Sequence, residues 1–174
     1  KVISGGNFHG ELMAQPFDFL AIAVSELGNI SERRIERMVN TTLSGMPSFL
    51  VKHPGLNSGF MITQYAAAAL VSENKTLSHP ASVDSITSCE NQEDFVSMGN
   101  WASRKAREVV KNTARILTTE LMIAAQAIDF RVEMEQGKYN LGKGTKAAYE
   151  AIREKVDFIE EDSNIEMYDE LEKA

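Results

Sequence analysis

The sequence has little of what disulfide-bonded, nucleic-acid-binding and membrane-spanning proteins need. It has one cysteine, so no disulfide can form within the chain, which fits a protein of the reducing cytoplasm. Its formal net charge of -7 argues against a phosphate backbone as partner, because nucleic-acid binders gather lysine and arginine into a basic face. No run of apolar residues approaches the roughly 18 that a membrane-spanning helix needs. We therefore expect a cytoplasmic protein that binds neither nucleic acid nor a membrane.

Patterns of metal ligands are also missing. The spacing of His9, His53 and His79 does not include the pair four residues apart on one helix that many zinc sites use. Cys89 has no histidine near it in the sequence that would activate it, so we interpret it as a small packed thiol. The sequence therefore predicts no metal site.

Proline and glycine are nearly absent between residues 94 and 136, where Gly99 is the one exception. Apolar residues recur there at helical spacing, which predicts one helix of about 43 residues, or roughly 65 Å at about 1.5 Å per residue. A compact globule of this chain length would be only about 40 Å across. Such a helix needs neighbours outside its own domain, so we expect a homo-oligomer of helical bundles.

The first half of the chain also favours helices over strands. Helices are predicted at residues 11–27, 32–41 and 58–73, where apolar residues follow helical spacing. Ser31 is the expected N-cap of the second of these, because a serine side chain can accept a hydrogen bond from a free N–H group of a first helical turn. Two irregular stretches, one rich in proline and glycine, separate the predicted helices from one another and from the long helix.

Beyond the long helix, a glycine-rich joint leads to an amphipathic helix with Thr145 as its expected N-cap. Its apolar side is predicted to carry Tyr149, Ile152, Val156 and Ile159. The acidic residues 160–162 are interpreted as a solvated helix end, and a capping box at residues 163–166 predicts a short terminal helix. The predicted fold is all-α: an elongated helical bundle with one very long central helix, divided into a central bundle region (residues 1–137) and a C-terminal helical extension (residues 138–174).

Four short segments carry most of the functional signal. Residues 4–10 read Ser-Gly-Gly-Asn-Phe-His-Gly and residues 57–61 read Asn-Ser-Gly-Phe-Met. Residues 79–86 read His-Pro-Ala-Ser-Val-Asp-Ser-Ile, and residues 91–99 read Asn-Gln-Glu-Asp-Phe-Val-Ser-Met-Gly. In this order and spacing the segments resemble signatures of the histidine and aromatic amino acid ammonia-lyase family, and most of all its histidine-specific members.

The resemblance implies an enzyme that eliminates ammonia from an L-amino acid, histidine first, to give urocanate. Members of the family use the electrophile methylideneimidazolone, which forms from an Ala-Ser-Gly tripeptide. That tripeptide is absent from these 174 residues. We therefore expect this chain to be the C-terminal part of a larger ammonia-lyase fold, inactive alone, whose residues 1–137 carry half of the active site. The family resemblance also suggests a homotetramer.

Six residues are carried over from the family motifs as candidates for the active site. Glu93, Phe8 and Asn7 are the catalytic candidates: Glu93 faces the substrate side chain, Phe8 packs beside the electrophile, and Asn7 donates or accepts a hydrogen bond near it. The candidates for binding the substrate are Met61, Asn91 and Gln92. A carboxylate at position 93 can accept a hydrogen bond from an imidazole N–H group or act as a general base.

Other interpretations remain open at this point. Without the motifs, Glu93 and Asp94 would be read as acids in the first turn of the long helix, where the helix dipole favours negative charge. Phe95 and residues 87–90 depart from the pattern of histidine-specific members, which leaves a tyrosine or phenylalanine ammonia-lyase, or a 2,3-aminomutase, as the alternative enzyme. A helical scaffold that oligomerises without chemistry is the alternative of another class.

Overall fold

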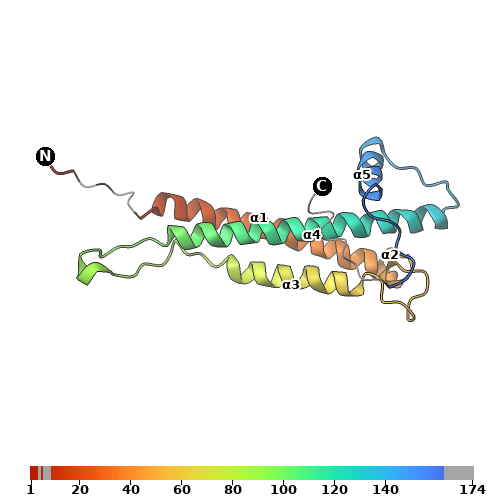
Figure 1. Ribbon diagram of the computed structural model, residues 1–174, viewed down its shortest axis with the longest axis horizontal. Coiled ribbons are helices and arrows are strands. Elements are labelled where there is room, and N and C mark those ends of the chain that lie inside the picture. The colour runs from red at the N-terminus through yellow and green to blue at the C-terminus, as the bar shows by residue number, and fades with distance from the viewer. Residues whose placement is uncertain (4, 6–8, 163–174) are drawn as a thin grey trace. The chain divides into compact units, whose positions relative to one another are not determined.

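The structure is a computed structural model that describes residues 1–3, 5 and 9–162 (Figure 1). Its α-helices are α1 (Glu11–Val39), α2 (Thr41–Ser44), α3 (Met61–Leu77), α4 (Gly99–Met134) and α5 (Lys143–Arg153). Two 3-10 helices, η1 (Ser48–Leu50) and η2 (Cys89–Asn91), lie in the loops. Within the described ranges, β-structure is limited to isolated bridges. The prediction of an all-α fold is confirmed.

The chain divides into two compact units. The first unit contains Lys1–Gly28 and Leu70–Thr113, and the second unit contains Asn29–Ala69 and Ala114–Ala174. Each of the helices α1, α3 and α4 contributes one part to each unit. Every hydrogen bond and ion pair discussed below lies within one unit.

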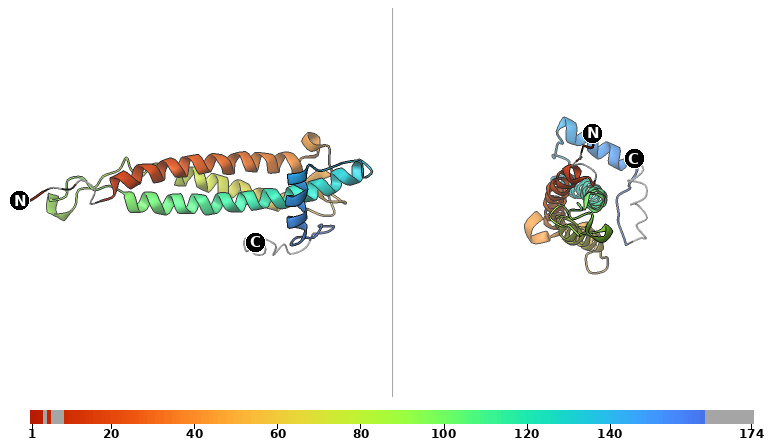
Figure 2. Two further views of the ribbon diagram at one scale, coloured as in Figure 1. Left: turned by 90° about the horizontal axis from the view of Figure 1, so that it is seen from above. Right: turned by 90° about the vertical axis from the view of Figure 1, so that its left-hand side faces the viewer.

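Small residues form the core of the first unit. Ala14 and Ala102 belong to one buried cluster, and Ala21, Ala106 and Val109 form another. Because alanine has no side chain beyond Cβ, α1 and α4 can approach closely, and Figures 1 and 2 show their first-unit parts side by side. The start of α1 is thereby fixed against the start of α4, and both ends lead into the functional motifs.

The second unit has a core of larger side chains. Ile35, Leu50, Phe60, Ile116 and Ile123 are all buried. They come from α1, η1, α4 and the residue that precedes α3. This unit therefore depends on larger buried apolar area than the alanine contacts of the first unit.

The sequence predicted Ser31 as an N-cap. This prediction is wrong, because α1 continues through Ser31 without a break. Its hydroxyl donates to Glu120 Oε2 at 2.6 Å, and Arg34 donates to the same carboxylate through Nη2 at 2.7 Å. A polar residue that looked like the start of a helix is thus satisfied by a residue of α4. The pairing partner is 89 residues away in sequence, so no local pattern indicated it.

The predicted long helix is confirmed, but it begins later than expected. α4 has 36 residues and starts at Gly99 rather than near residue 94. The preceding backbone is held in another conformation, because Ser85 and Ser97 form an isolated bridge and the Val96 N–H donates to Ser85 Oγ at 3.0 Å. Within the described part of the chain, no helix combines the length and the apolar character that crossing a membrane requires.

The predicted C-terminal amphipathic helix is shorter than expected. α5 starts at Lys143, before the proposed N-cap Thr145, and ends at Arg153. Val156 and Ile159 are buried, as an apolar side predicts, but they lie in non-helical chain. Residues 160–162 are therefore not a helix end, and the terminal helix predicted from residue 163 lies outside the described residues.

Candidate active site

The loop between α3 and α4 carries two of the four motifs and folds back on itself (green in Figure 1). Ser88 and Glu93 form an isolated bridge, with Ser88 N–H to Glu93 C=O at 3.0 Å and Glu93 N–H to Ser88 C=O at 3.3 Å. Between them the chain turns through left-handed conformations at Cys89, Glu90 and Asn91, with φ of 50°, 53° and 71°. Such backbone is strained for residues other than glycine, so the surroundings must hold it.

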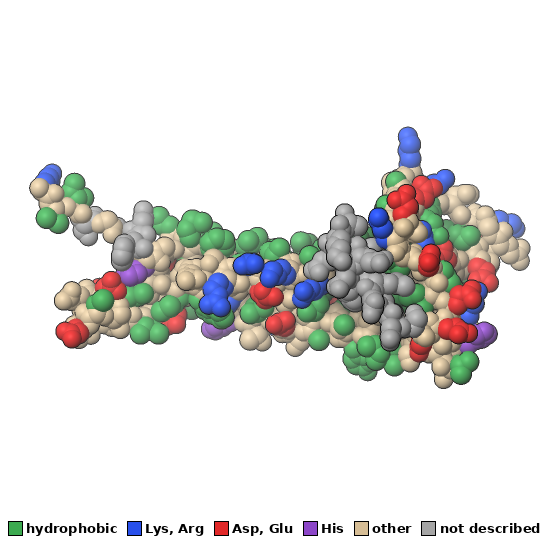
Figure 3. Space-filling view, in the orientation of Figure 1, with side chains coloured by type: hydrophobic (Ala, Val, Ile, Leu, Met, Phe, Trp, Pro, Cys, Tyr) green, Lys and Arg blue, Asp and Glu red, His purple; other side chains and the backbone are tan. Residues whose placement is uncertain are grey.

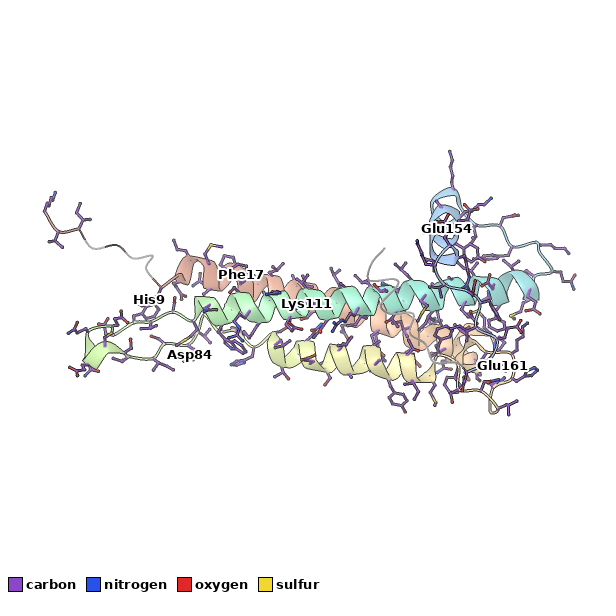
Figure 4. All side chains as sticks on the ribbon, viewed as in Figure 1. His9, Phe17, Asp84, Lys111, Glu154 and Glu161 are labelled. Carbon is purple, nitrogen blue, oxygen red and sulfur yellow. The ribbon has the colours of Figure 1, made fainter. Side chains whose placement is uncertain are left out.

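The Glu93 carboxylate is the centre of this loop. Ser88 Oγ donates to Glu93 Oε2 at 2.7 Å, and His9 Nε2 lies 3.6 Å from Glu93 Oε1. The side chains of His9 and Glu93 are 28% and 32% exposed, so the acid is accessible to a small molecule from solvent. Figure 4 labels His9 at the N-terminal end of α1 and Asp84 in the loop between α3 and α4.

His9 is also held through its main chain. The Ser97 hydroxyl donates to the carbonyl of His9. A Cβ atom on Gly99 would lie 2.9 Å from the Gly10 carbonyl oxygen and 3.2 Å from that of His9, so only glycine permits this contact. The structure therefore brings the end of the first motif against the fourth motif, where α4 begins.

A buried acid on α1 fixes the third motif. Asp18 accepts the N–H groups of Ala81 at 2.8 Å and of Ser82 at 2.7 Å, and Lys105 Nζ lies 3.5 Å from its other oxygen. Lys105 in turn donates to the carbonyl of His79. Burial alone would raise the pKa of the Asp18 carboxyl, but the N–H groups of Ser82 and Ala81 stabilise its charged form and the pKa falls below its ordinary value.

The second motif lies in the second unit, in the turn before α3. Gly59 has φ of 51°, and a Cβ atom there would lie 2.5 Å from the carbonyl oxygen of Phe49. The Phe60 N–H donates to that same carbonyl at 3.0 Å, and the Phe60 ring is buried. Met61, the first residue of α3, follows this fixed turn and is half-buried.

Asp162 holds the same turn from the C-terminal side. Its carboxylate accepts the N–H groups of Ser58 at 2.7 Å and Gly59 at 2.8 Å, while its own N–H donates to Asn57 Oδ1 at 3.1 Å. The bonds from Ser58 and Gly59 lower the pKa of the Asp162 carboxyl. An acid that the sequence indicated only as part of a solvated run therefore pairs with backbone of the second motif.

The predicted site residues have different outcomes. Glu93 is not in the first turn of α4, so the alternative interpretation of Glu93 and Asp94 as acids of that turn is wrong. Asn91 and Gln92 are exposed in the same loop, and Met61 belongs to the second unit. Asn7 and Phe8 lie outside the described residues. The roles of all six remain predictions.

Sequence reasoning missed Ser88 and Asp18 and considered His9 only as a metal ligand. Their contacts depend on folding of the loop against α1, which no local spacing indicates. His9 did have one signal, since it lies within the first motif, directly after Phe8. Among residues 1–3, 5 and 9–162, no three His, Cys, Asp or Glu side chains are grouped so that they could hold a metal ion.

Comparison with known proteins identifies relatives along nearly the whole chain. The family model described as aromatic amino acid lyase matches residues 1–154. The histidine ammonia-lyases of Streptococcus pyogenes serotype M1 and of Streptococcus sanguinis strain SK36 are each 69% identical to this chain over 173 residues. These alignments cover 99% of this chain and 33% of each relative, so the chain spans about a third of their length.

Solved structures show the same similarity. The histidine ammonia-lyase from Trypanosoma cruzi matches with a TM-score of 0.91 and 51% identity, covering 99% of this chain and 33% of that one. The tyrosine aminomutase from Streptomyces globisporus matches with a TM-score of 0.90 and 41% identity, covering 100% of this chain and 33% of that one.

Proposed function

Because the chain belongs to the aromatic amino acid lyase family, we propose that it forms part of an ammonia-lyase active site that converts L-histidine to urocanate and ammonia. The observation that carries this proposal is Glu93, a partly exposed acid next to the end of the Gly-Asn-Phe-His segment. The 69% identity to streptococcal histidine ammonia-lyases supports histidine as the substrate. The whole enzyme is then a carbon-nitrogen lyase.

Each candidate residue has a defined task in this proposal. Glu93 accepts a hydrogen bond from the imidazole N–H of the substrate or takes the proton that leaves its β-carbon. Phe8 and Met61 make apolar contacts with planar groups, for which an aromatic ring and a flexible thioether are suited. Asn7 supplies a hydrogen bond beside Phe8, and the amides of residues 91 and 92 bind or support the substrate carboxylate.

The electrophile has to come from polypeptide outside these residues, since no Ala-Ser-Gly tripeptide occurs in the sequence. We propose methylideneimidazolone, whose chemistry is to activate the substrate amine as a leaving group. The described residues fit such a group, because the close contact of Gly99 with the backbone of His9 and Gly10 fixes the segment that follows Phe8. An acid beside that segment can then act on the β-proton of a substrate.

Two alternatives have support from particular features. Phe95 and residues 87–90, together with the 41% identity to a tyrosine aminomutase, favour a tyrosine or phenylalanine lyase or a 2,3-aminomutase. Large apolar side chains exposed on α1 favour assembly into a homo-oligomer, for which we propose a tetramer, and a pure scaffold would use the same surface. Residues 1–137 and 138–174 remain our proposed domains, and the single cysteine supports a cytoplasmic location.

The test is an assay of the full-length gene product with histidine, tyrosine and phenylalanine. We expect histidine to give the unsaturated acid, detected by its near-ultraviolet absorbance. Product from tyrosine or phenylalanine alone would support the alternative enzyme, a β-amino acid product would indicate an aminomutase, and no product from any of them would favour the scaffold.

The Glu93→Gln variant tests the role of the acid directly. Glutamine keeps the size of the side chain but can no longer act as a base, so kcat should fall about 100-fold to 10,000-fold. Glu90→Gln, in the same loop and exposed, is the matched control and should keep wild-type kinetics. Wild-type kinetics for Glu93→Gln would reject the role of Glu93 as a base.

A further inference from the structure

The two oxygens of the Glu93 carboxylate have different surroundings. Oε2 accepts a hydrogen bond of 2.7 Å from the Ser88 hydroxyl, a normal length for an O–H donor and an ionised acceptor. Oε1 faces His9 Nε2 at 3.6 Å, which is longer than a hydrogen bond. Oε1 therefore keeps acceptor capacity, while Oε2 is engaged within the loop.

The Ser88 hydroxyl takes no part in the backbone pairing of the loop. The backbone N–H and C=O of Ser88 already pair with those of Glu93, and Ser85 Oγ independently accepts the Val96 N–H. The side chain of Ser88 therefore adds a contact to the acid and not to the backbone pairing. A carboxylate on a side chain with several free torsions would otherwise sample several rotamers.

On the basis of the function proposed above, we infer that Ser88 is a positioning residue that holds Glu93 so that Oε1, and not Oε2, meets the substrate. The orientation follows from the left-handed turn between the two residues, which places their side chains on the same side of the bridge within hydrogen-bond distance. His9 limits the movement of Oε1 on the other side. The acid is thus fixed before the substrate binds, so the substrate does not have to order it.

Kinetics of the full-length enzyme test this inference. Ser88→Ala removes one hydrogen bond to a charged group and should lower kcat for histidine about tenfold to a hundredfold with a smaller change in KM. Ser88→Thr keeps the hydroxyl and should retain most of the activity. Ser85→Ala, which removes a hydroxyl of the same loop that accepts a backbone N–H group, is the matched control: it should alter thermal stability more than kcat.

A double-mutant cycle shows whether Ser88 acts through Glu93. In the Glu93→Gln background, Ser88→Ala should cause little further loss, because the group it positions is already inactive. Full additivity of the two losses would overturn the inference. So would equal losses in Ser88→Ala and Ser85→Ala, which would indicate a purely structural effect.

A crystal structure of the full-length Ser88→Ala variant separates this inference from the proposed function. We expect the Glu93 carboxylate to leave the rotamer that it adopts in the wild-type enzyme. An unchanged rotamer would overturn the positioning role even in an active enzyme. A changed rotamer in the variant, together with no lyase activity of the wild-type enzyme, would support the positioning role and reject the proposed reaction.

Discussion

Gly99, the first residue of α4, lies against the backbone of His9 and Gly10 in the candidate site. Gly99→Ala would place a methyl group 2.9 Å from the Gly10 carbonyl oxygen, so the backbone before α1 has to move. We expect a loss of about 1–3 kcal/mol in the free energy of unfolding and a lower kcat, because Glu93 and His9 separate. Thermal unfolding and steady-state kinetics of the full-length protein measure the two effects.

Gly144→Ala is the matched control for this substitution. A Cβ at residue 144 would meet nothing within 4 Å, and the residue lies inside α5. Alanine there should be neutral or slightly stabilising. Equal behaviour of the two variants would mean that the close contact at Gly99 does not matter.

Asp18 gives the protein a stability that depends on pH. Its pKa is lower in the folded state than its ordinary value of 3.8, so its contribution is present above that value and is lost as the pH falls through the folded pKa. Asp18→Asn also leaves Lys105 buried without its counter-ion. We expect Asp18→Asn to lower the free energy of unfolding by about 3 kcal/mol at pH 7.

Denaturant unfolding of wild type and Asp18→Asn at several pH values checks this prediction. The difference between the two proteins should be largest near neutral pH. It should shrink as the pH falls below about 4, because the unfolded chain then binds a proton at Asp18, and it should be lost as the pH falls through the lower pKa of the folded state. A difference that stays constant from pH 7 to pH 3 would contradict the charged state of Asp18 as its source.

At the scale of elements, the sequence predicted the helices that follow from neighbouring residues. It missed the helix boundaries that depend on contacts with residues distant in the sequence. The long α4 was predictable because proline is absent from it and apolar residues recur at helical spacing. Its start was not, because Ser85 holds Val96 in loop conformation. The sequence also did not show that two predicted helices join into α1, where the Ser31 hydroxyl donates to Glu120 and does not cap a helix.

The candidate site divides in the same way. The motifs predicted Glu93 as the acid, since a short ordered pattern is visible in one sequence, and this role remains a prediction. The surroundings of Glu93 were not predictable. Ser88 reaches the carboxylate because the chain between them makes a left-handed turn, and His9 belongs to a segment far from Glu93 in the sequence. The sequence also could not show that Asp18 fixes the third motif, since its partners are more than 60 residues away.

Gln126 explains how the segment after α5 is buried without being helical. Its amide donates to the carbonyls of Leu50 at 3.2 Å and Ile159 at 2.8 Å, and it accepts the Ile159 N–H at 3.2 Å. Gln126→Leu would leave these buried backbone groups unsatisfied, so we expect a loss of about 3 kcal/mol in the free energy of unfolding. Urea unfolding measures the loss, and hydrogen exchange at Ile159 should become much faster.

Gln15→Leu serves as the control for Gln126→Leu, because Gln15 is exposed on α1 and donates a hydrogen bond to the nearby side chain of Glu11. It should leave both measurements unchanged. If the backbone N–H of Ile159 exchanged at the wild-type rate in Gln126→Leu, the side-chain amide of Gln126 would not be the group that holds this segment.

For the whole molecule, the surface of α1 in the first unit is the feature on which our proposal of a homo-oligomer rests. Six large apolar side chains there are 43% to 73% exposed, and Figure 3 shows hydrophobic side chains over this helix. They are Leu12, Met13, Phe19, Leu20, Ile22 and Leu27. A set of this size on one helix is unusual for a monomer, and burial between subunits would stabilise an oligomer through the hydrophobic effect.

Phe19 is the most exposed of these side chains at 73%, so a charge there tests the assembly with little risk to the core. In the full-length protein we expect Phe19→Glu to shift sedimentation from a tetramer to smaller species, because an unpaired carboxylate is costly to bury between subunits. Lys138→Glu, at an exposed position beyond α4, should sediment as wild type does. An unchanged tetramer in Phe19→Glu would show that this surface of α1 is not a subunit interface, and a monomeric wild type would reject the proposed oligomer itself.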